Sequence, residues 1–189
     1  MDPLPTSPDV SRARALLDGQ KRVLASINED RPLHEVLTQI CHVVEEQGDG
    51  LYASILLLDE AGERLLHGAA PSLPEGYNKA IHGITIGNGV GSCGTAAATG
   101  EPCIVDDIAT HPNWAPFRAL ALDTHGLAAC WSTPIRAYDG RVVATFAIYH
   151  NVPKKPTLKE RKLIDFTSHL VAIAINRHRE IEDLKETAD

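Results

Sequence analysis

Three cysteines, Cys93, Cys103 and Cys130, are the first candidates for chemistry in this sequence, because a cysteine thiolate is both a nucleophile and a metal ligand. Neither they nor Cys41 form a CxxC pair, so the spacing resembles neither a zinc cluster nor a dense secreted disulfide framework. Buried cysteines also commonly serve as small hydrophobic residues. The pattern leaves thiol chemistry and core packing as alternatives. It fits a reducing cytoplasm, where we expect the protein to be located.

Carboxylates offer a second kind of chemistry at Asp106 and Asp107, which Glu101 precedes. Paired carboxylates can polarise a water molecule or receive a cationic ligand group, since one carboxylate raises the pKa of the other. The same residue types cap turns and helices. We favour capping over catalysis and keep both aspartates as candidate ligand-binding residues.

A glycine-rich segment, Gly87-x-Gly89-x-Gly91-Ser92, resembles a loop that binds phosphate through its backbone amides. It lacks a lysine before a serine or threonine, and no pattern of parallel strands and helices surrounds it. We expect these glycines instead to supply positive φ angles and close packing at a crossover. Four aromatic residues follow, and such side chains line ligand pockets as well as cores: Trp114, Phe117, Trp131 and Phe146.

Hydrophobic periodicity predicts the elements that position these residues. Apolar residues at three- and four-residue steps indicate two helices before any strand, and β-branched or aliphatic runs indicate two hairpins with an irregular crossover between them. Thr157 and Glu160 have the spacing of a capping box, so a long final helix should begin there. The expected elements are helices over 16–27 and 33–44, a hairpin over 52–70, a crossover over 71–94 with a helical turn at 75–81, a strand over 102–105, a short helix over 114–124, a hairpin over 127–150 and the final helix. This order is typical of an α+β fold with an antiparallel sheet and helices on one face.

Composition limits the class of protein. The 189 residues are 43% hydrophobic and 23% charged, which suits one globular domain with helical extensions. A formal net charge of -7 argues against nucleic acid and membrane surfaces as partners. No aliphatic run could span a bilayer, and the N-terminus does not resemble an export signal. The apolar seam of the final helix continues beyond Arg177, which predicts a partner helix; a solvated, fraying tail is the alternative.

Further motifs occur in a characteristic order. They are the run 83–97, Gly100-Glu101-Pro102, Val105-Asp106-Asp107-Ile108, Pro112-x-Trp114 and Cys130-Trp131-Ser132-Thr133-Pro134-Ile135. In this order they resemble the GAF domains of bacterial cyclases and histidine kinases, over roughly residues 15–178. The resemblance implies a five- to six-stranded antiparallel sheet with the N- and C-terminal helices on one face and a ligand pocket on the other. Residues 1–14 would be a flexible N-terminus, and residues 179–189 an extension of the last helix.

The resemblance also implies a function, that of a sensory module that binds a small molecule and acts as a homodimer through its terminal helices. We expect the ligand to contact the crossover and the segment from Asp106 to Phe117. The candidate ligand-binding residues are Cys93, Thr95, Asp106, Asp107, Trp114, Phe117, Trp131 and Phe146.

Three histidines depart from the family pattern. His82 and His111 stand where an acidic residue is usual, and His150 replaces an aromatic residue. Imidazoles around one pocket would suit a metal or haem b, with the second ring nitrogen of each ligand held by an acceptor. His82 is the first candidate for the iron ligand, then His67 or His150. Such a protein would be a gas sensor or a stand-alone enzyme with redox or lyase chemistry on a small nitrogen compound.

A third hypothesis is a thiol-based enzyme. Cys93 and Cys103 are ten residues apart, which resembles the spacing in the GAF-fold reductases of free methionine sulfoxide, where one cysteine attacks the sulfoxide and another resolves the intermediate. Cys130 lies directly in the strand motif, unlike the third cysteine of those reductases. The resemblance thus makes these three cysteines candidate catalytic residues, with the binding module favoured.

Overall fold

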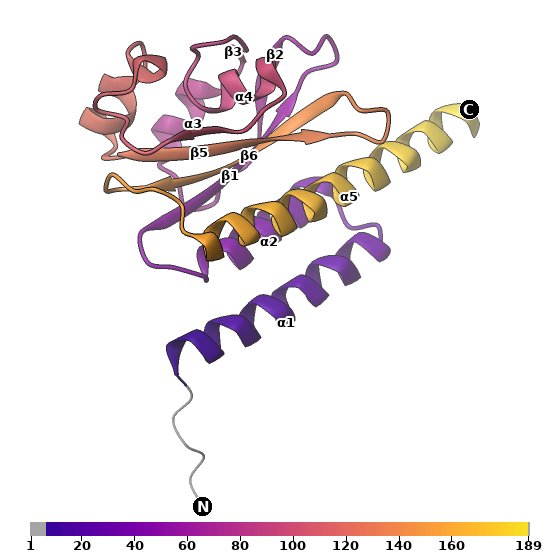
Figure 1. The fold of residues 1–189 in the computed structure, drawn as a ribbon. Helices are drawn as coiled ribbons and strands as arrows, with labels where there is room; N and C mark the ends of the chain where they lie inside the picture. The colour runs from indigo at the N-terminus through magenta and orange to yellow at the C-terminus, as the bar shows by residue number, and fades with distance from the viewer. Residues whose placement is uncertain (1–6, 189) are drawn as a thin grey trace, which may run out of the picture.

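The structure, a computed structural model, describes residues 7–188. Its centre is a six-stranded antiparallel sheet with the spatial order β3-β2-β1-β6-β5-β4 (Figure 1). The strands are β1 (Leu51–Leu58), β2 (Arg64–Ala69), β3 (Ile84–Thr85), β4 (Cys103–Val105), β5 (Ala129–Arg136) and β6 (Val142–His150). The expected α+β fold with an antiparallel sheet is therefore confirmed.

Three long helices cover one face of the sheet (Figure 1). They are α1 (Pro8–Asn28), α2 (Leu33–Glu45) and α5 (Leu158–Ala188). α2 and α5 lie against the strands, and α1 packs outside them. Fully buried side chains of α2 and α5, such as Leu37 and Val171, meet Ile55 and Ile148 of the sheet. The terminal helices thus lie on one face, as predicted, and burial of this apolar layer holds them there.

Local sequence explains where these helices begin. Ser7 Oγ accepts a hydrogen bond from the N–H of Val10 at 3.4 Å, so α1 begins at Pro8, inside the segment 1–14 assigned to a flexible N-terminus. Residues 1–6 lie outside the described part of the chain. Thr157 Oγ1 accepts from the N–H of Glu160 at 3.2 Å, as the predicted capping box requires. The Glu160 carboxylate instead accepts from Lys154 Nζ at 2.6 Å, so only half of the box forms.

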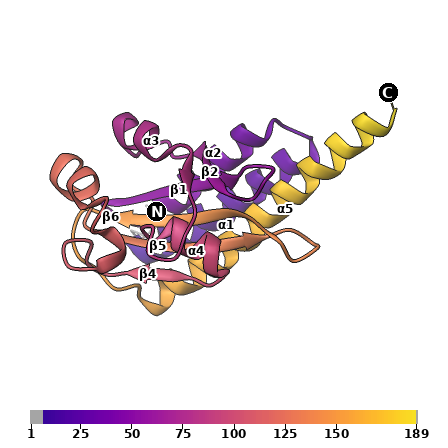
Figure 2. The ribbon, with the colours of Figure 1, turned by 90° about the horizontal axis from the view of Figure 1, so that it is seen from above.

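Shorter elements cover the other face (Figure 2). They are α3 (Glu75–Ile81), α4 (Cys93–Thr99), a 3₁₀ turn (Pro112–Trp114) and a π-helical turn (Ala119–Thr124). The helical turn at 75–81 is confirmed. The single helix over 114–124 is wrong, because two separate turns replace it. The crossover 71–94 was expected to be too irregular for sheet, yet its residues 84–85 pair with β2 as β3.

The second hairpin, β5–β6, forms as predicted. Gly140 has φ 87°, which glycine adopts without a steric penalty, and the N–H of Arg141 donates to Asp139 Oδ1 at 2.9 Å. Strand alternation then divides the side chains between the layers. Cys130 and Trp131 are neighbours in β5 and therefore face opposite sides of the sheet.

None of the helices within residues 7–188 combines the length and apolarity that a bilayer crossing requires.

Candidate functional site

A small cavity lies between α3, α4 and the sheet. Its volume is about 20 Å³, which is room for about one water molecule. We call it the α4-face cavity, and its walls are Leu56, Tyr77, Ile81, Ile84, Val90, Gly91, Ser92, Cys93, Gly94, Trp114, Phe117 and Tyr149. Three of the predicted ligand-binding residues, Cys93, Trp114 and Phe117, therefore meet at one place.

Hydrogen bonds and aromatic contacts fix the walls of this cavity. Ser92 Oγ donates to the carbonyl of Cys130 and accepts from Trp114 Nε1, each at 3.0 Å. The hydroxyls of Tyr77 and Tyr149 are 2.9 Å apart, and the Trp114 ring packs edge-on against Tyr149 with centroids 6.4 Å apart. The cavity thus has rigid aromatic sides and a thiol at the start of α4.

Unpartnered hydroxyl groups lie on the sheet face that carries α4. Ser54, Ser132 and Thr145 are at most 1% exposed, and their side-chain oxygens have no hydrogen-bond partner among the described residues. Ser54 and Ser132 both pair in register with Ala147, so they form one row across β1, β6 and β5. Buried polar atoms of this kind are normally satisfied by water or by a ligand. This face therefore offers polar groups next to aromatic walls.

Cys93 is the thiol of the site whose pKa is lowered. Its pKa is lowered to about 7, first by the Cys130 thiol and then by the nearby hydroxyls of Ser132, Thr145 and Tyr149, which outweigh the effect of burial. Burial raises the pKa of Cys130 well above the usual range. Cys103 lies opposite Ser132 in β4, so the structure brings the three candidate cysteines to one face of the sheet.

The Cys93 pKa leads to a prediction about alkylation. Because the thiolate reacts, the rate at which iodoacetamide modifies Cys93 should rise with pH with a midpoint near 7. Cys130→Ala removes the largest cause of the low pKa and should move the midpoint upward. Cys103→Ala is the matched control and should leave it in place. Mass spectrometry of each cysteine over a pH series measures this, and an unmoved midpoint in Cys130→Ala would contradict the assignment.

Thr95 and Asp107 hold loops together and do not line the cavity. Thr95 Oγ1 donates to the carbonyl of Gly91 at 2.6 Å and accepts from the N–H of Gly89 at 3.1 Å. Asp107 Oδ1 accepts from the N–H of Ala109 at 3.0 Å, which is the capping role that the sequence favoured. Asp106 lies beside it and also stays away from the cavity. The backbone amides of Gly89 and Gly91 in the glycine-rich loop thus both donate to acceptors inside the protein: Gly89 to Thr95, and Gly91 to the backbone carbonyl of Asn113 at 2.8 Å. They are therefore not free to bind phosphate.

Trp131 and Phe146 lie on the opposite face of the sheet. Both belong to the apolar layer between the sheet and the long helices and are 1% exposed. Trp131 Nε1 donates to the carbonyl of Lys154 at 3.0 Å. The structure thus separates these two candidates from Cys93, Trp114 and Phe117.

The four histidines do not all gather around one pocket, because His82 and His67 share a hollow whereas His150 and His111 lie elsewhere. His82 Nδ1 accepts from the backbone N–H of His67 at 2.9 Å, and both flank a hollow of about 360 Å³ beside α3. A neutral ring that accepts at Nδ1 carries its proton on Nε2. An imidazole that binds a metal through Nε2 needs that nitrogen free of a proton and donates a hydrogen bond from Nδ1–H instead. His150 lies on the helix-covered face against Trp131, and His111 Nδ1 caps a turn by accepting from Asn113 N–H. This arrangement does not fit haem ligation by His82. Within residues 7–188 no three His, Cys, Asp or Glu side chains form a metal-binding group.

Comparison with known proteins agrees with this architecture. Residues 30–176 match the family described as GAF domain. The chain is 38% identical over 175 residues to the methyl sulfide methyltransferase-associated sensor of Methanosarcina acetivorans, which covers 93% of this chain and 17% of that relative. The chain thus spans about a sixth of the relative's length.

Solved structures share the fold at low sequence identity. A GAF sensor protein from Burkholderia vietnamiensis superimposes with a TM-score of 0.70 at 19% identity, covering 89% of this chain and 98% of that one. The free methionine-R-sulfoxide reductase of Neisseria meningitidis, in complex with its substrate, gives a TM-score of 0.71 at 15% identity and covers 96% of this chain and 98% of that one. The family match over most of the sequence shows that this chain belongs to the GAF domain family.

Proposed function

We propose that this GAF domain is a sensory module that binds a small, largely apolar molecule in the α4-face cavity. The observation that carries the proposal is the meeting of aromatic walls and the Cys93 thiol at one small cavity. The unpartnered hydroxyls of Ser132 and Thr145 lie close to Cys93 on the same face of the sheet. Ligand sites typically combine apolar walls with a few polar groups. Since the cavity holds only about 20 Å³, binding requires α3 or the segment around Phe117 to move. A ligand that favours the moved state would shift the domain toward it.

Methylated sulfides are the ligands to test first. The name of the Methanosarcina relative connects that sensor with a methyltransferase for methyl sulfide. Dimethyl sulfide is small and uncharged, and a divalent sulfur makes favourable contacts with aromatic rings such as those of Trp114 and Tyr149. The aromatic lining of the cavity is suited to such a molecule, which would enter once α3 or the segment around Phe117 has moved.

A cavity-filling substitution tests this site. Cys93→Val adds bulk at the cavity and should weaken dimethyl sulfide binding about tenfold, which corresponds to about 1.4 kcal/mol. Cys41→Val is the matched control, because Cys41 is buried in the other layer, and it should leave binding unchanged. Saturation-transfer NMR of the ligand methyl protons measures both dissociation constants. Equal binding in the two variants would place the ligand elsewhere, and no saturable binding to the wild type would reject this ligand class.

The proposal includes a homodimer formed through the terminal helices. Val10, Leu17 and Leu24 recur every seven residues on α1 and are at least 40% exposed. Phe166 and Ile173 repeat this spacing on α5 with exposures of 46% and 40%. Such apolar stripes are typical of helices that pack against a partner. A ligand-induced shift near α4 could then alter how the two copies pack.

A thiol-based enzyme is the second candidate, favoured by the low Cys93 pKa and by the location of all three cysteines on one face. If the chain reduces free methionine sulfoxide, Cys93→Ser should abolish turnover, whereas a binding module has no turnover to lose.

Haem binding stays a prediction of the sequence. An absorption band near ~400 nm after expression with haem, lost in one histidine variant, would support it. A colourless protein would argue against it.

A further inference from the structure

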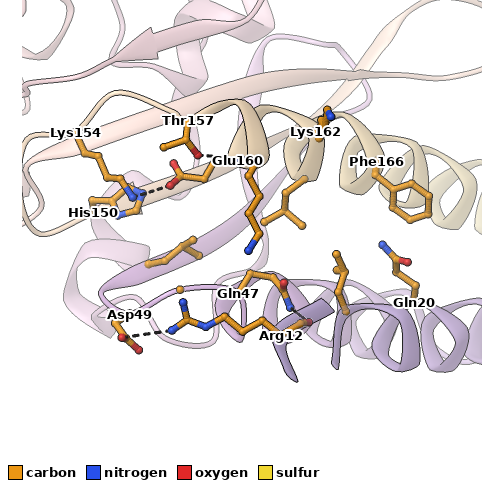
Figure 3. A pocket seen from close by; sticks show the side chains of 15 residues that line it. Arg12, Gln20, Gln47, Asp49, His150, Lys154, Thr157, Glu160, Lys162 and Phe166 are labelled. Atoms are coloured by element: carbon orange, nitrogen blue, oxygen red, sulfur yellow. Dashed lines mark hydrogen bonds and ion pairs between the residues drawn. The ribbon is translucent and has the colours of Figure 1, made fainter. Parts of the chain in front are cut away.

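A larger hollow lies on the helix-covered face, far from the α4-face cavity. It opens between the beginning of α1 and the beginning of α5 and has a volume of about 680 Å³, within the usual range of small-molecule sites (Figure 3). We call it the α1/α5 cleft. It is lined by residues of α1, of the turn after α2, of the facing ends of β1 and β6 and of the first turns of α5 with the connection before it.

The charge of the cleft opposes the charge of the chain. Four cationic side chains and two carboxylates line it, and Asp9 pairs with one of the lysines, which leaves an excess of one positive charge in a chain with a formal net charge of -7. Lys154 is paired with Glu160 at 2.6 Å, whereas Arg12 meets Asp49 at 3.5 Å and Lys159 meets Asp9 at 3.8 Å. Lys162 has no acidic partner within 4.0 Å in the part of the chain that the structure describes. Local positive charge of this kind attracts anions.

One polar side chain at one end of the cleft is buried without a partner at its ring nitrogen. His150 is 3% exposed, and its Nε2 has no hydrogen-bond partner within residues 7–188. Glu160 Oε2 also has none, but that carboxylate is already paired with Lys154 and, as an acceptor, does not favour an anion. Figure 3 shows His150 beside the Lys154–Glu160 pair. A buried polar atom left unpaired destabilises the fold, so such atoms commonly contact a bound water or ligand. This observation is independent of the charge excess and points to the same place.

The rest of the lining is apolar. Leu16 of α1 and Leu163 of α5 face the cleft with Leu51, and the Phe166 ring is 46% exposed at its side. A simple inorganic anion would leave this surface in water. A molecule with an apolar body and an anionic head would cover it and place its charge near the cations.

We infer that the α1/α5 cleft binds an amphipathic carboxylate. Its carboxylate lies among Arg12, Lys159 and Lys162 within reach of the His150 ring, and its apolar body covers Leu163 and Phe166. Because the cleft separates the two terminal helices, a bound carboxylate would hold α1 against α5. It would act on these helices from the face opposite the α4-face cavity.

Octanoate is the probe for this site, and neutral octanamide of the same chain length is its control. Calorimetric titration of the wild-type chain with octanoate should show saturable binding of one molecule per chain, with octanamide about tenfold weaker. Arg12→Gln/Lys162→Gln removes two cations and should weaken octanoate binding about tenfold or more. Lys21→Gln/Arg22→Gln removes two cations of α1 that do not line the cleft and should leave binding unchanged. All four substitutions are at exposed or half-buried positions, so the fold should be retained.

A second measurement reads the buried end of the cleft. The ring centroids of Trp131 and His150 are 4.6 Å apart. In the variant Trp114→Phe, Trp131 is the remaining tryptophan, and octanoate bound beside His150 should change its fluorescence. No saturable octanoate binding, equal affinity for octanamide, or equal loss in the two double variants would each overturn the inference. If octanoate is displaced as the protein dimerises, the cleft is covered by a second copy of the chain, and the inference of a carboxylate site is wrong. Dimethyl sulfide binding should not respond to Arg12→Gln/Lys162→Gln, so this inference and the proposed ligand can fail separately.

Discussion

Trp131→Ala is expected to lower the free energy of unfolding by about 3–5 kcal/mol, the usual effect of removing a large buried aromatic side chain. Trp131 is 1% exposed in the layer between the sheet and the long helices, and its indole donates to the carbonyl of Lys154 at 3.0 Å. The substitution leaves a cavity, an unpaired carbonyl and a gap beside the His150 ring. Urea denaturation followed by Trp114 fluorescence measures the change.

The control separates core packing from ligand binding. Trp131→Phe keeps most of the apolar volume and should lose less stability than Trp131→Ala. Under conditions where each variant is folded, dimethyl sulfide should bind as it does to the wild type, because Trp131 faces away from the α4-face cavity. A loss of less than about 1 kcal/mol, or a specific loss of ligand binding, would show that Trp131 belongs to a site and not to the core.

This contrast shows where sequence reasoning failed. The sequence analysis assigns Trp131 to the same ligand site as Cys93 and Trp114, but Trp131 follows Cys130 in β5 and faces the other side of the sheet, because side chains alternate between the two faces of a strand. Phe146 and Tyr149 of β6 are three residues apart and therefore also face opposite sides. The alternation was available from the sequence. Which face would carry the cavity was not, because it depends on where α4 packs.

The long elements were predictable because their signals are strong. Apolar spacing located α1 and α2, and the Asp139-Gly140 turn located the β5–β6 hairpin. α4 gave no comparable signal, since its seven residues are all small and show no division into an apolar and a charged face. The same smallness allows close packing: a Cβ added at Gly94 would lie 2.7 Å from Val90. Packing against the rest of the protein therefore stabilises α4 more than the helix propensity and apolar spacing of its own residues do.

The residues missed at the site were recognisable only in three dimensions. Tyr77 and Tyr149 are 72 positions apart, yet their hydroxyls are joined at 2.9 Å. Ser132 and Thr145 are ordinary strand residues until α4 covers them and leaves their hydroxyls without partners. Nothing in a single sequence indicates such pairings, because they arise from the register of the strands and the placement of the crossover.

Leu17→Glu/Ile173→Glu is expected to weaken the proposed homodimer at least about 100-fold, which corresponds to about 2.8 kcal/mol. Leu17 is 52% and Ile173 40% exposed in the single chain, on the apolar stripes of α1 and α5. A carboxylate in a seam between helices must be desolvated without a partner, whereas in the monomer it stays in water. Sedimentation equilibrium should therefore show a dimer for the wild type and a monomer for the variant.

The matched control is Val152→Glu, which adds a carboxylate at a 55% exposed position in the connection before α5, outside both stripes. It should dimerise like the wild type, and thermal unfolding of the monomer should be nearly unchanged in both variants, since surface substitutions usually have small effects. Deleting the residues after Arg177 removes Leu184 and should weaken the dimer less, because the stripes of α1 and of the first part of α5 remain. A wild-type chain that stays monomeric at high concentration would contradict the dimer. Equal dimerisation of Val152→Glu and Leu17→Glu/Ile173→Glu would move the interface away from these helices.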